Sequence, residues 1–266
     1  MDCLRVTLYV RICQTKIVLD KHMNKPSKKE IINSTKPLKK KVDLKINGRR
    51  VEYVVTRKGV GHLITKFGIF LLYNFHIDDK WEEYNVLIKS KIGKNFQPLF
   101  SNNVLHIRID SGCLTGQVFD DKTCECKAQL FRSMKEISKL GEGIIISIPG
   151  QDGRGMGIPF KLATLSLQYC WGLNTVEAAK LIAKGGCIDK RDYFGAIAIL
   201  KFFGVEDGTK IDLLTNNPSK ITAFTQNKYF QVERKELVIK ADEFTERHLL
   251  AKQKYLGHVG LVKENN

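Results

Sequence analysis

The 266-residue sequence has no run of 18 or more apolar residues, which excludes an ordinary transmembrane helix. Residues 1–16 are too charged, and their apolar stretch too short, for a secretory signal. No RNA-binding aromatic motif or helix-turn-helix pattern is found. The odd total of 7 cysteines does not suit a disulfide framework and is typical of free thiols or metal ligands in a reducing compartment. We therefore expect a cytoplasmic protein without a membrane partner.

Acidic residues are scarce at the start of the chain, and this scarcity accounts for most of the net charge of +16. Residues 1–60 carry 16 Lys and Arg against 5 Asp and Glu, a surplus of 11, and the other 206 residues carry a surplus of only 5. A basic run of this kind is usually a solvated tail. We expect residues 1–60 to be a basic, partly disordered extension, and nucleic acid to be a partner at most through this tail.

What is present in the rest of the sequence is a globular pattern, since 43% of all residues are hydrophobic and 27% charged. Residues 42–56 alternate around Asn47-Gly48, which predicts a β-hairpin. From residue 61 onward, segments with strand-like and helix-like patterns alternate; the strands are expected at 61–75, 83–92, 103–110, 143–149 and 210–217, and the helices at 127–140, 160–173, 174–186 and 217–224. This alternation predicts an α/β fold, an α+β mixed sheet with covering helices, over residues 61–266.

Three cysteines are clustered in the middle of the chain, at Cys113, Cys124 and Cys126. The set is one ligand short of a closed structural zinc site, and the nearest histidine, His106, fits no zinc-finger spacing. Three protein ligands leave one position for water, which is the arrangement of a hydrolytic zinc site. The alternative is three small apolar residues that pack without a metal.

Several motifs in sequence order resemble the GTP cyclohydrolase II family, whose members open GTP in the first step of riboflavin synthesis. These motifs are RIDSGCLTGQVFDDKTCECKAQL, GIIISIPGQDGRGMGIPFKL, NTVEAAKLIA, DKRDYFGAIAILKFFGV, LLTNNPSKI and the ending AKQKYLGHVGL. The resemblance covers residues 61–262 and leaves residues 1–60 outside. It implies a homodimer that binds one Zn²⁺ per chain, with Mg²⁺ on the nucleotide phosphates. It also implies that zinc-activated water opens the imidazole ring, with formate and pyrophosphate released from GTP.

The resemblance assigns roles to individual residues. The zinc ligands are Cys113, Cys124 and Cys126, in agreement with the spacing argument. The substrate-binding positions are Arg108, Ser111, Gln129, Asp152, Gly153, Arg154, Thr175, Thr215 and Lys220. The catalytic pair for pyrophosphate release is Asp189 and Arg191. A guanidinium stays protonated below pH ~12, so Arg191 either passes a proton to Asp189 and acts as a nucleophile or stabilises charge on the phosphates.

The chain departs from the family pattern around the base. Leu165 stands where the family has an essential tyrosine, Ala163 where it has arginine, and Ala179 where it has asparagine. Asp110 and Gly112 replace a usual histidine and glutamate. Leucine has no hydroxyl and cannot transfer a proton, so these changes concern the hydrolytic steps rather than the metal.

The zinc ligands are thus kept while residues around the base are changed, and three hypotheses follow from this combination. The chain either performs the full reaction with Asp110 or ordered water in place of the tyrosine, or it stops at a formamidopyrimidine or acts on another nucleotide or pyrimidine derivative. In the third hypothesis it is a non-catalytic nucleotide-binding protein that keeps the fold and the metal.

Overall fold

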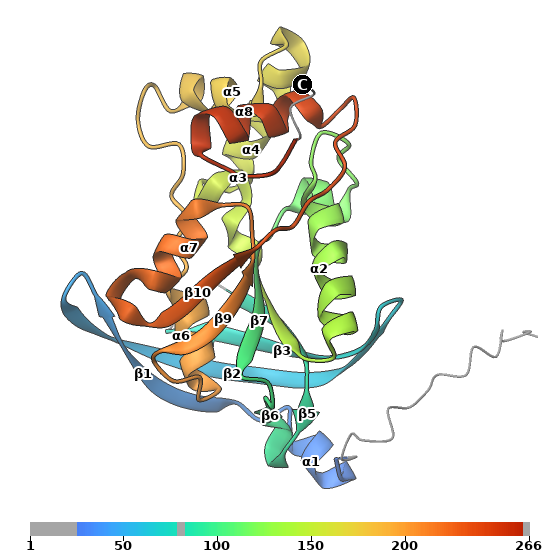
Figure 1. Cartoon of the computed structure of the whole chain (residues 1–266), viewed down its shortest axis with the longest axis vertical. Coiled ribbons are helices and arrows are strands. Elements are labelled where there is room, and N and C mark those ends of the chain that lie inside the picture. The colour runs from blue at the N-terminus through green and yellow to red at the C-terminus, as the bar shows by residue number, and fades with distance from the viewer. Residues whose placement is uncertain (1–25, 79–82, 263–266) are drawn as a thin grey trace, which may run out of the picture.

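The computed structural model describes residues 26–78 and 83–262 (Figure 1). Of the basic extension 1–60 that was expected to be partly disordered, residues 1–25 lie outside the described residues. The main sheet has eight strands in the order β1-β2-β3-β4-β8-β7-β9-β10. These strands are β1 (Leu38–Ile46), β2 (Arg49–Thr65), β3 (Gly68–Ile77), β4 (Glu83–Lys89), β7 (Val104–Ser111), β8 (Gly143–Ile148), β9 (Thr209–Leu214) and β10 (Phe230–Lys235); β5 (Lys91–Ile92) and β6 (Pro98–Leu99) form a separate pair.

The helices are α1 (Lys28–Asn33), α2 (Cys126–Leu140), α3 (Asp152–Gly155), α4 (Gly157–Trp171), α5 (Thr175–Ile182), α6 (Phe194–Phe202), α7 (Pro218–Thr225) and α8 (Glu246–Leu256). Helices α2 to α7 connect the strands from β7 to β10, whereas α1 precedes β1 and α8 follows β10. The predicted α/β architecture, a mixed sheet with covering helices, is confirmed. In the described part of the chain, no helix is both long and apolar enough to cross a membrane.

The first two strands form an antiparallel hairpin that belongs to the main sheet. Its turn residues Asn47 and Gly48 have φ of 49° and 81°, as a two-residue hairpin loop requires. β2 runs through residue 60, so the boundary that the sequence analysis places between residues 60 and 61 lies inside a strand. Val42 and Leu44 of β1 are buried in the same core as the rest of the sheet.

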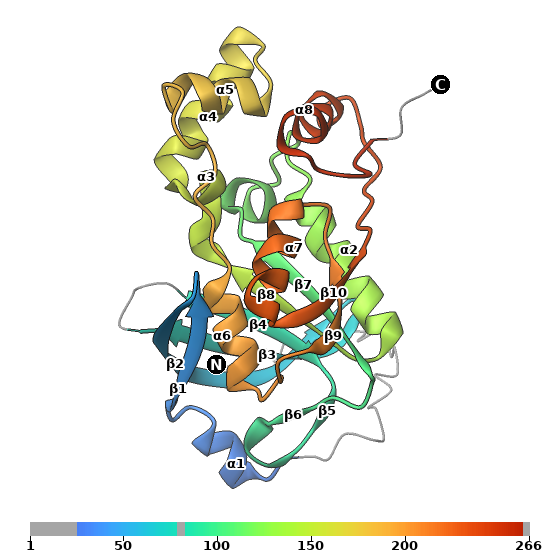
Figure 2. The ribbon, with the colours of Figure 1, turned by 60° about the vertical axis from the view of Figure 1, so that its left-hand side comes forward.

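The two faces of the sheet are covered by different helices because successive strand residues point to opposite sides. On β8, Ile144 and Ile146 face the larger core that includes α6, and Ile145 faces a smaller cluster with Met134 and Ile137 of α2. α6 packs against β1 and β2 (Figure 2) and is buried along most of its length. The sheet is thereby a central layer with helices on both sides.

Four neighbouring strands, β8, β7, β9 and β10, are parallel, so their carboxyl ends meet at one edge. Beyond this edge, α4, α5 and α8 pack together (Figure 1). Ligands of open α/β sheets bind at the carboxyl ends of parallel strands. The fold therefore places a candidate site between this edge and the three helices.

Candidate active site

Three loops that follow parallel strands converge on one cavity at this edge. Ser111 ends β7 and Cys113 follows it, Asp152 and Arg154 lie in the short helix α3 after β8, and Thr215 follows β9. The lining residues predicted from the sequence are Arg108, Ser111, Cys113, Cys124, Cys126, Gln129, Asp152, Gly153, Arg154, Thr175, Arg191, Thr215 and Lys220. Of the predicted site residues, Asp189 does not line the cavity, although it contacts one that does.

The three cysteines lie together at one end of the cavity. Their sulfur atoms are all within 4.8 Å of one another, and the Sγ atoms of Cys113 and Cys124 are 3.5 Å apart. Tetrahedral zinc with Zn–S bonds of about 2.3 Å holds its sulfur ligands about 3.8 Å apart, so this donor set fits zinc. Gly116 makes the close approach possible, because a Cβ at this position would lie 2.8 Å from Sγ of Cys124.

The thiols share their protons and face a positive charge. Hydrogen bonds among them lower the pKa of Cys113 and raise that of Cys124 to about 11. Burial opposes the charge of Lys161 on α4, but the neighbouring thiols outweigh burial and raise its pKa above the ordinary value. The cluster is thus a thiol set with an ammonium group beside it, and zinc binding there would displace the remaining thiol protons.

Basic side chains dominate the rest of the cavity lining. The cations are Arg108, Arg154, Lys161, Arg191, Lys220 and Lys252, against the acids Asp110, Glu125 and Asp152. A concave surface with a surplus of positive charge attracts and binds anions, and arginine forks match phosphate oxygens. The lining therefore suits a phosphorylated ligand.

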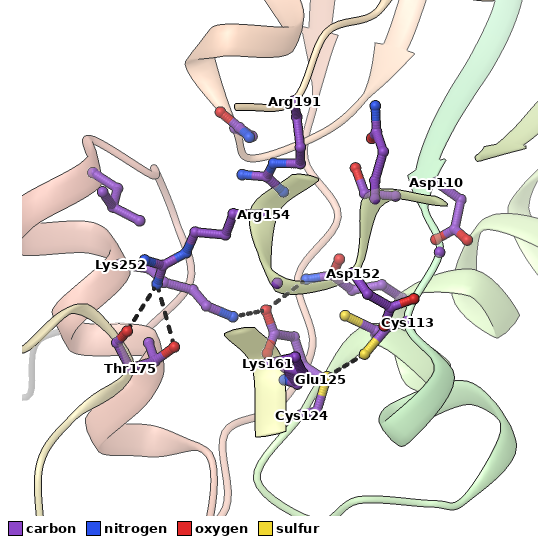
Figure 3. A pocket seen from close by; sticks show the side chains of 18 of the residues that line it. Asp110, Cys113, Cys124, Glu125, Asp152, Arg154, Lys161, Thr175, Arg191 and Lys252 are labelled. Atoms are coloured by element: carbon purple, nitrogen blue, oxygen red, sulfur yellow. Dashed lines mark hydrogen bonds and ion pairs between the residues drawn. The ribbon is translucent and has the colours of Figure 1, made fainter. Parts of the chain in front are cut away.

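Arg154 is held in a strained backbone conformation, with φ of 60° in the left-handed region. Its Nη2 donates to the carbonyl oxygen and the hydroxyl of Thr175, at 3.1 and 3.2 Å, while its Nη1 is buried without a partner. Burial and the nearby Arg191 lower its pKa to about 10. Figure 3 shows Arg154 and Arg191 together, apart from the sulfur atoms. Among the described residues, Nε of Arg108 is also buried without a partner, so more than one lining group is available to a ligand.

Arg191 is oriented by Asp189. Its Nε and Nη2 donate to the two carboxylate oxygens of Asp189, the first at 2.9 Å. Burial acts against the charged guanidinium, but the hydrogen bonds with Asp189 outweigh burial and raise the pKa of Arg191. The pair therefore keeps Arg191 protonated and holds its guanidinium, which lines the cavity, in a fixed orientation.

Buried hydrogen bonds hold two further lining side chains, Arg108 and Lys220, in place. Arg108 donates to Oε1 of Gln129 at 2.9 Å, and Nζ of Lys220 donates to the carbonyl oxygen of Ile109 at 2.7 Å. Burial, with the neighbouring Arg108 and Arg191 adding to it, lowers the pKa of Lys220 well below its usual value. The network fixes the side chain of Gln129 beside the thiol cluster.

Three of the departures from the family pattern have a structural consequence. Gly112 has no room for a side chain, because a Cβ there would lie 2.6 Å from Cα of Pro149. Asp110 is buried in the cavity lining and accepts hydrogen bonds from Gln117 and Ser147, at 2.8 and 3.2 Å. Leu165 is outside the set of lining residues.

Thirteen lining residues were not predicted as site residues: Asp110, Gly112, Glu125, Gln151, Phe160, Lys161, Thr164, Ala179, Asn216, Asn217, Lys252, Leu256 and His258. The position of Glu125 between two cysteines in C-E-C was a signal that it lies near the cluster. Lys252, Leu256 and His258 belong to the motif-like ending of the chain, but nothing in their spacing indicates that α8 returns to the cavity. Only the tertiary structure brings them to the site.

A thiol cluster that fits a tetrahedral metal, beside a cavity rich in cations, defines a candidate metalloenzyme site for a phosphorylated substrate. The model of the GTP cyclohydrolase II family matches residues 57–234, and the chain belongs to this family. The resemblance noted from the motifs is thereby confirmed.

Curated relatives carry riboflavin-biosynthesis names. Riboflavin biosynthesis protein RibBA of Staphylococcus saprophyticus is 35% identical over 195 residues, 73% of this chain and 45% of the relative. Monofunctional riboflavin biosynthesis protein RIBA 3, chloroplastic, of Arabidopsis thaliana is 31% identical over 230 residues, 86% of this chain and 42% of the relative. The chain thus spans slightly less than half the length of each of these two relatives. Among solved structures, RibBX of A. baumannii, a two-domain 3,4-dihydroxy-2-butanone 4-phosphate synthase, aligns with a TM-score of 0.33 and 17% identity over 71% of this chain and 40% of that chain.

Proposed function

We propose that this protein is a zinc-dependent hydrolase that opens the imidazole ring of GTP and releases formate and pyrophosphate. The product would be a 2,5-diamino-6-ribosylamino-pyrimidinone phosphate for riboflavin synthesis. The observation that carries the proposal is the thiol cluster inside a cation-lined cavity, in a chain of the GTP cyclohydrolase II family.

Zinc would be held by Cys113, Cys124 and Cys126, whose spacing fits its bond lengths. Bound with three protein ligands, zinc supplies an activated water near neutral pH. Lys161 balances the negative charge that the deprotonated thiols bring to a buried position.

The phosphates would be bound by Arg154 and Arg191, with Mg²⁺ accompanying them as it commonly does with nucleotides. Asp189 holds the guanidinium of Arg191 in place, and the structure favours charge stabilisation over nucleophilic attack because Arg191 is firmly protonated. The carbonyl oxygen of Gln129 accepts from Arg108, and its amide nitrogen donates one N–H to Oε1 of Glu125 at 3.3 Å, so the second N–H would bind a carbonyl oxygen of the base.

A second candidate function, ring opening that stops at a formamidopyrimidine, is favoured by Gly112, where no glutamate side chain can fit. Mass spectrometry of the products from GTP, Mg²⁺ and zinc-loaded protein separates the two. Release of formate with pyrophosphate supports the full reaction, and a formyl group retained on the pyrimidine supports the second candidate. Binding of GTP without any product would instead indicate a non-catalytic nucleotide-binding protein.

We also propose a homodimer. α4 exposes large apolar side chains, with Leu162, Tyr169 and Trp171 52%, 91% and 77% exposed, and a second copy of the chain would cover them. Light scattering on the wild type and on Trp171→Arg tests this, since the variant should shift toward the monomer. A cytoplasmic location stays a prediction, because only the name of the Arabidopsis relative mentions a compartment, and it is the chloroplast.

A further inference from the structure

The C-terminal segment, from α8 to Val259, lies beyond the residues that the family model matches, which end at 234. It nevertheless forms one wall of the cavity through Lys252, Leu256 and His258. The segment is therefore part of the site itself.

Hydrogen bonds attach this segment to two other walls. Nδ1 of His248 accepts from the backbone N–H of Thr175 at the start of α5, at 3.2 Å, and the backbone N–H of Val259 donates to the carbonyl oxygen of Asn216 after β9, at 3.1 Å. α8 is thus held in a defined position relative to both the helical layer and the sheet edge.

A third attachment reaches the thiol cluster. Nζ of Lys252 lies 2.6 Å from Oε1 of Glu125, whose neighbours in the chain are Cys124 and Cys126 (Figure 3). Both side chains are largely buried, at 19% and 6% exposure. Lys252 is thus the ion-pair partner of a buried carboxylate that lies between two of the proposed zinc ligands.

We propose that Lys252 is a positioning residue for the metal site: through Glu125 it fixes the loop that carries Cys124 and Cys126. Without Lys252 the loop loses its contact with α8, and this loss releases the loop even where no uncompensated charge remains; the unpaired carboxylate of Glu125 would in addition draw the loop toward water. Outer contacts that orient metal ligands typically matter by 10–100-fold in metal affinity. The proposal rests on the proposed function only in that the cluster holds zinc.

Lys252→Met tests this inference in the full-length protein, with Lys254→Met as the matched control, since Lys254 is exposed on the same helix. Competition with a chromophoric chelator should show zinc affinity lowered about 10–100-fold in Lys252→Met. Lys252→Arg, which keeps the charge, should recover most of this loss, and Lys254→Met should match the wild type. Equal zinc affinity in Lys252→Met and Lys254→Met would overturn the proposal.

The double variant Lys252→Met with Glu125→Gln separates positioning from general stability. It removes both buried charges, so it should fold even where the single variant does not. Zinc affinity that stays low in the double variant supports a positioning role, and affinity that returns to the wild-type value contradicts it.

Thiol alkylation followed by mass spectrometry, in zinc-free protein, keeps the test independent of the proposed function. Cys124 and Cys126 should be alkylated faster in Lys252→Met than in Lys254→Met, because the loop has lost its attachment. Equal alkylation rates would count against the proposal, whereas a wild-type protein that binds no zinc would count against the proposed function alone.

Discussion

Asp189→Asn should slow pyrophosphate release while ring opening continues. Asp189 lies outside the cavity lining and would act through Arg191. Its two carboxylate oxygens accept hydrogen bonds from Nε and Nη2 of Arg191. Asparagine keeps one acceptor for Nε but turns the other oxygen into an NH₂ group that faces Nη2. The fork of Arg191 then loses one charge-assisted hydrogen bond and its fixed orientation.

The size of the effect follows from that single bond. A hydrogen bond between charged groups contributes about 1.5–3 kcal/mol, which corresponds to about 10–150-fold in rate. The assay measures pyrophosphate by enzyme coupling and formate in the same sample. We expect the ratio of pyrophosphate to formate in the initial rates to fall by this factor. A ratio that stays at the wild-type value would refute the assigned role of the pair.

The pH dependence distinguishes charge stabilisation from nucleophilic attack by Arg191. At the ordinary arginine pKa of about 12.5, fewer than about 1 in 30,000 side chains are neutral at pH 8, and Asp189 raises the pKa of Arg191 further. A nucleophilic role predicts a tenfold increase in pyrophosphate release per pH unit between pH 7 and 9. We expect no such increase from this group, and a log-linear slope of one that Arg191→Lys abolishes would contradict our assignment.

Three further predictions concern other parts of the site. Leu165→Tyr should leave the products from GTP unchanged by mass spectrometry, because residue 165 does not line the cavity; a switch from retained to released formyl would contradict this. Gly116→Ala should weaken zinc binding in a chelator competition, because its Cβ would press on Sγ of Cys124, whereas Gly150→Ala has open space and should not. Burial lowers the pKa of His248 to about 4, below its unfolded value of about 6.5, so the unfolded state takes up a proton first as the pH falls. Stability measured by urea unfolding should therefore drop by about 2 kcal/mol between pH 7 and 5 from this group, and His248→Asn should flatten the curve; an identical slope in the variant would argue against it.

The sequence predicts the metal cluster well because its signal is local. The C-x10-C-x-C spacing and the strand before it are enough to place Cys113, Cys124 and Cys126 near each other, and the structure brings their sulfur atoms within 4.8 Å. The helix predicted at 174–186 is likewise found as α5, whose start is capped by Asn174 and Glu177 in a capping box.

The remaining parts of the site depend on contacts between distant segments. The pairing of Glu125 with Lys252 joins residues 127 positions apart, and no spacing rule predicts such a contact. The place of the hairpin in the main sheet is similar, because alternation predicts strands but not which strand lies next to β3. Family motifs assign Asp189 to the site, whereas only the geometry shows that it lies outside the cavity lining.

The most direct test of the central claim follows the carbon that ring opening would remove. Zinc-loaded protein is incubated with Mg²⁺ and GTP labelled with ¹³C at C8, and the label is followed by NMR beside a folded Cys124→Ala control. The account predicts a growing ¹³C-formate signal with the wild type and none with the variant. Label that remains in the guanine ring, or formate release by Cys124→Ala at the wild-type rate, would contradict it.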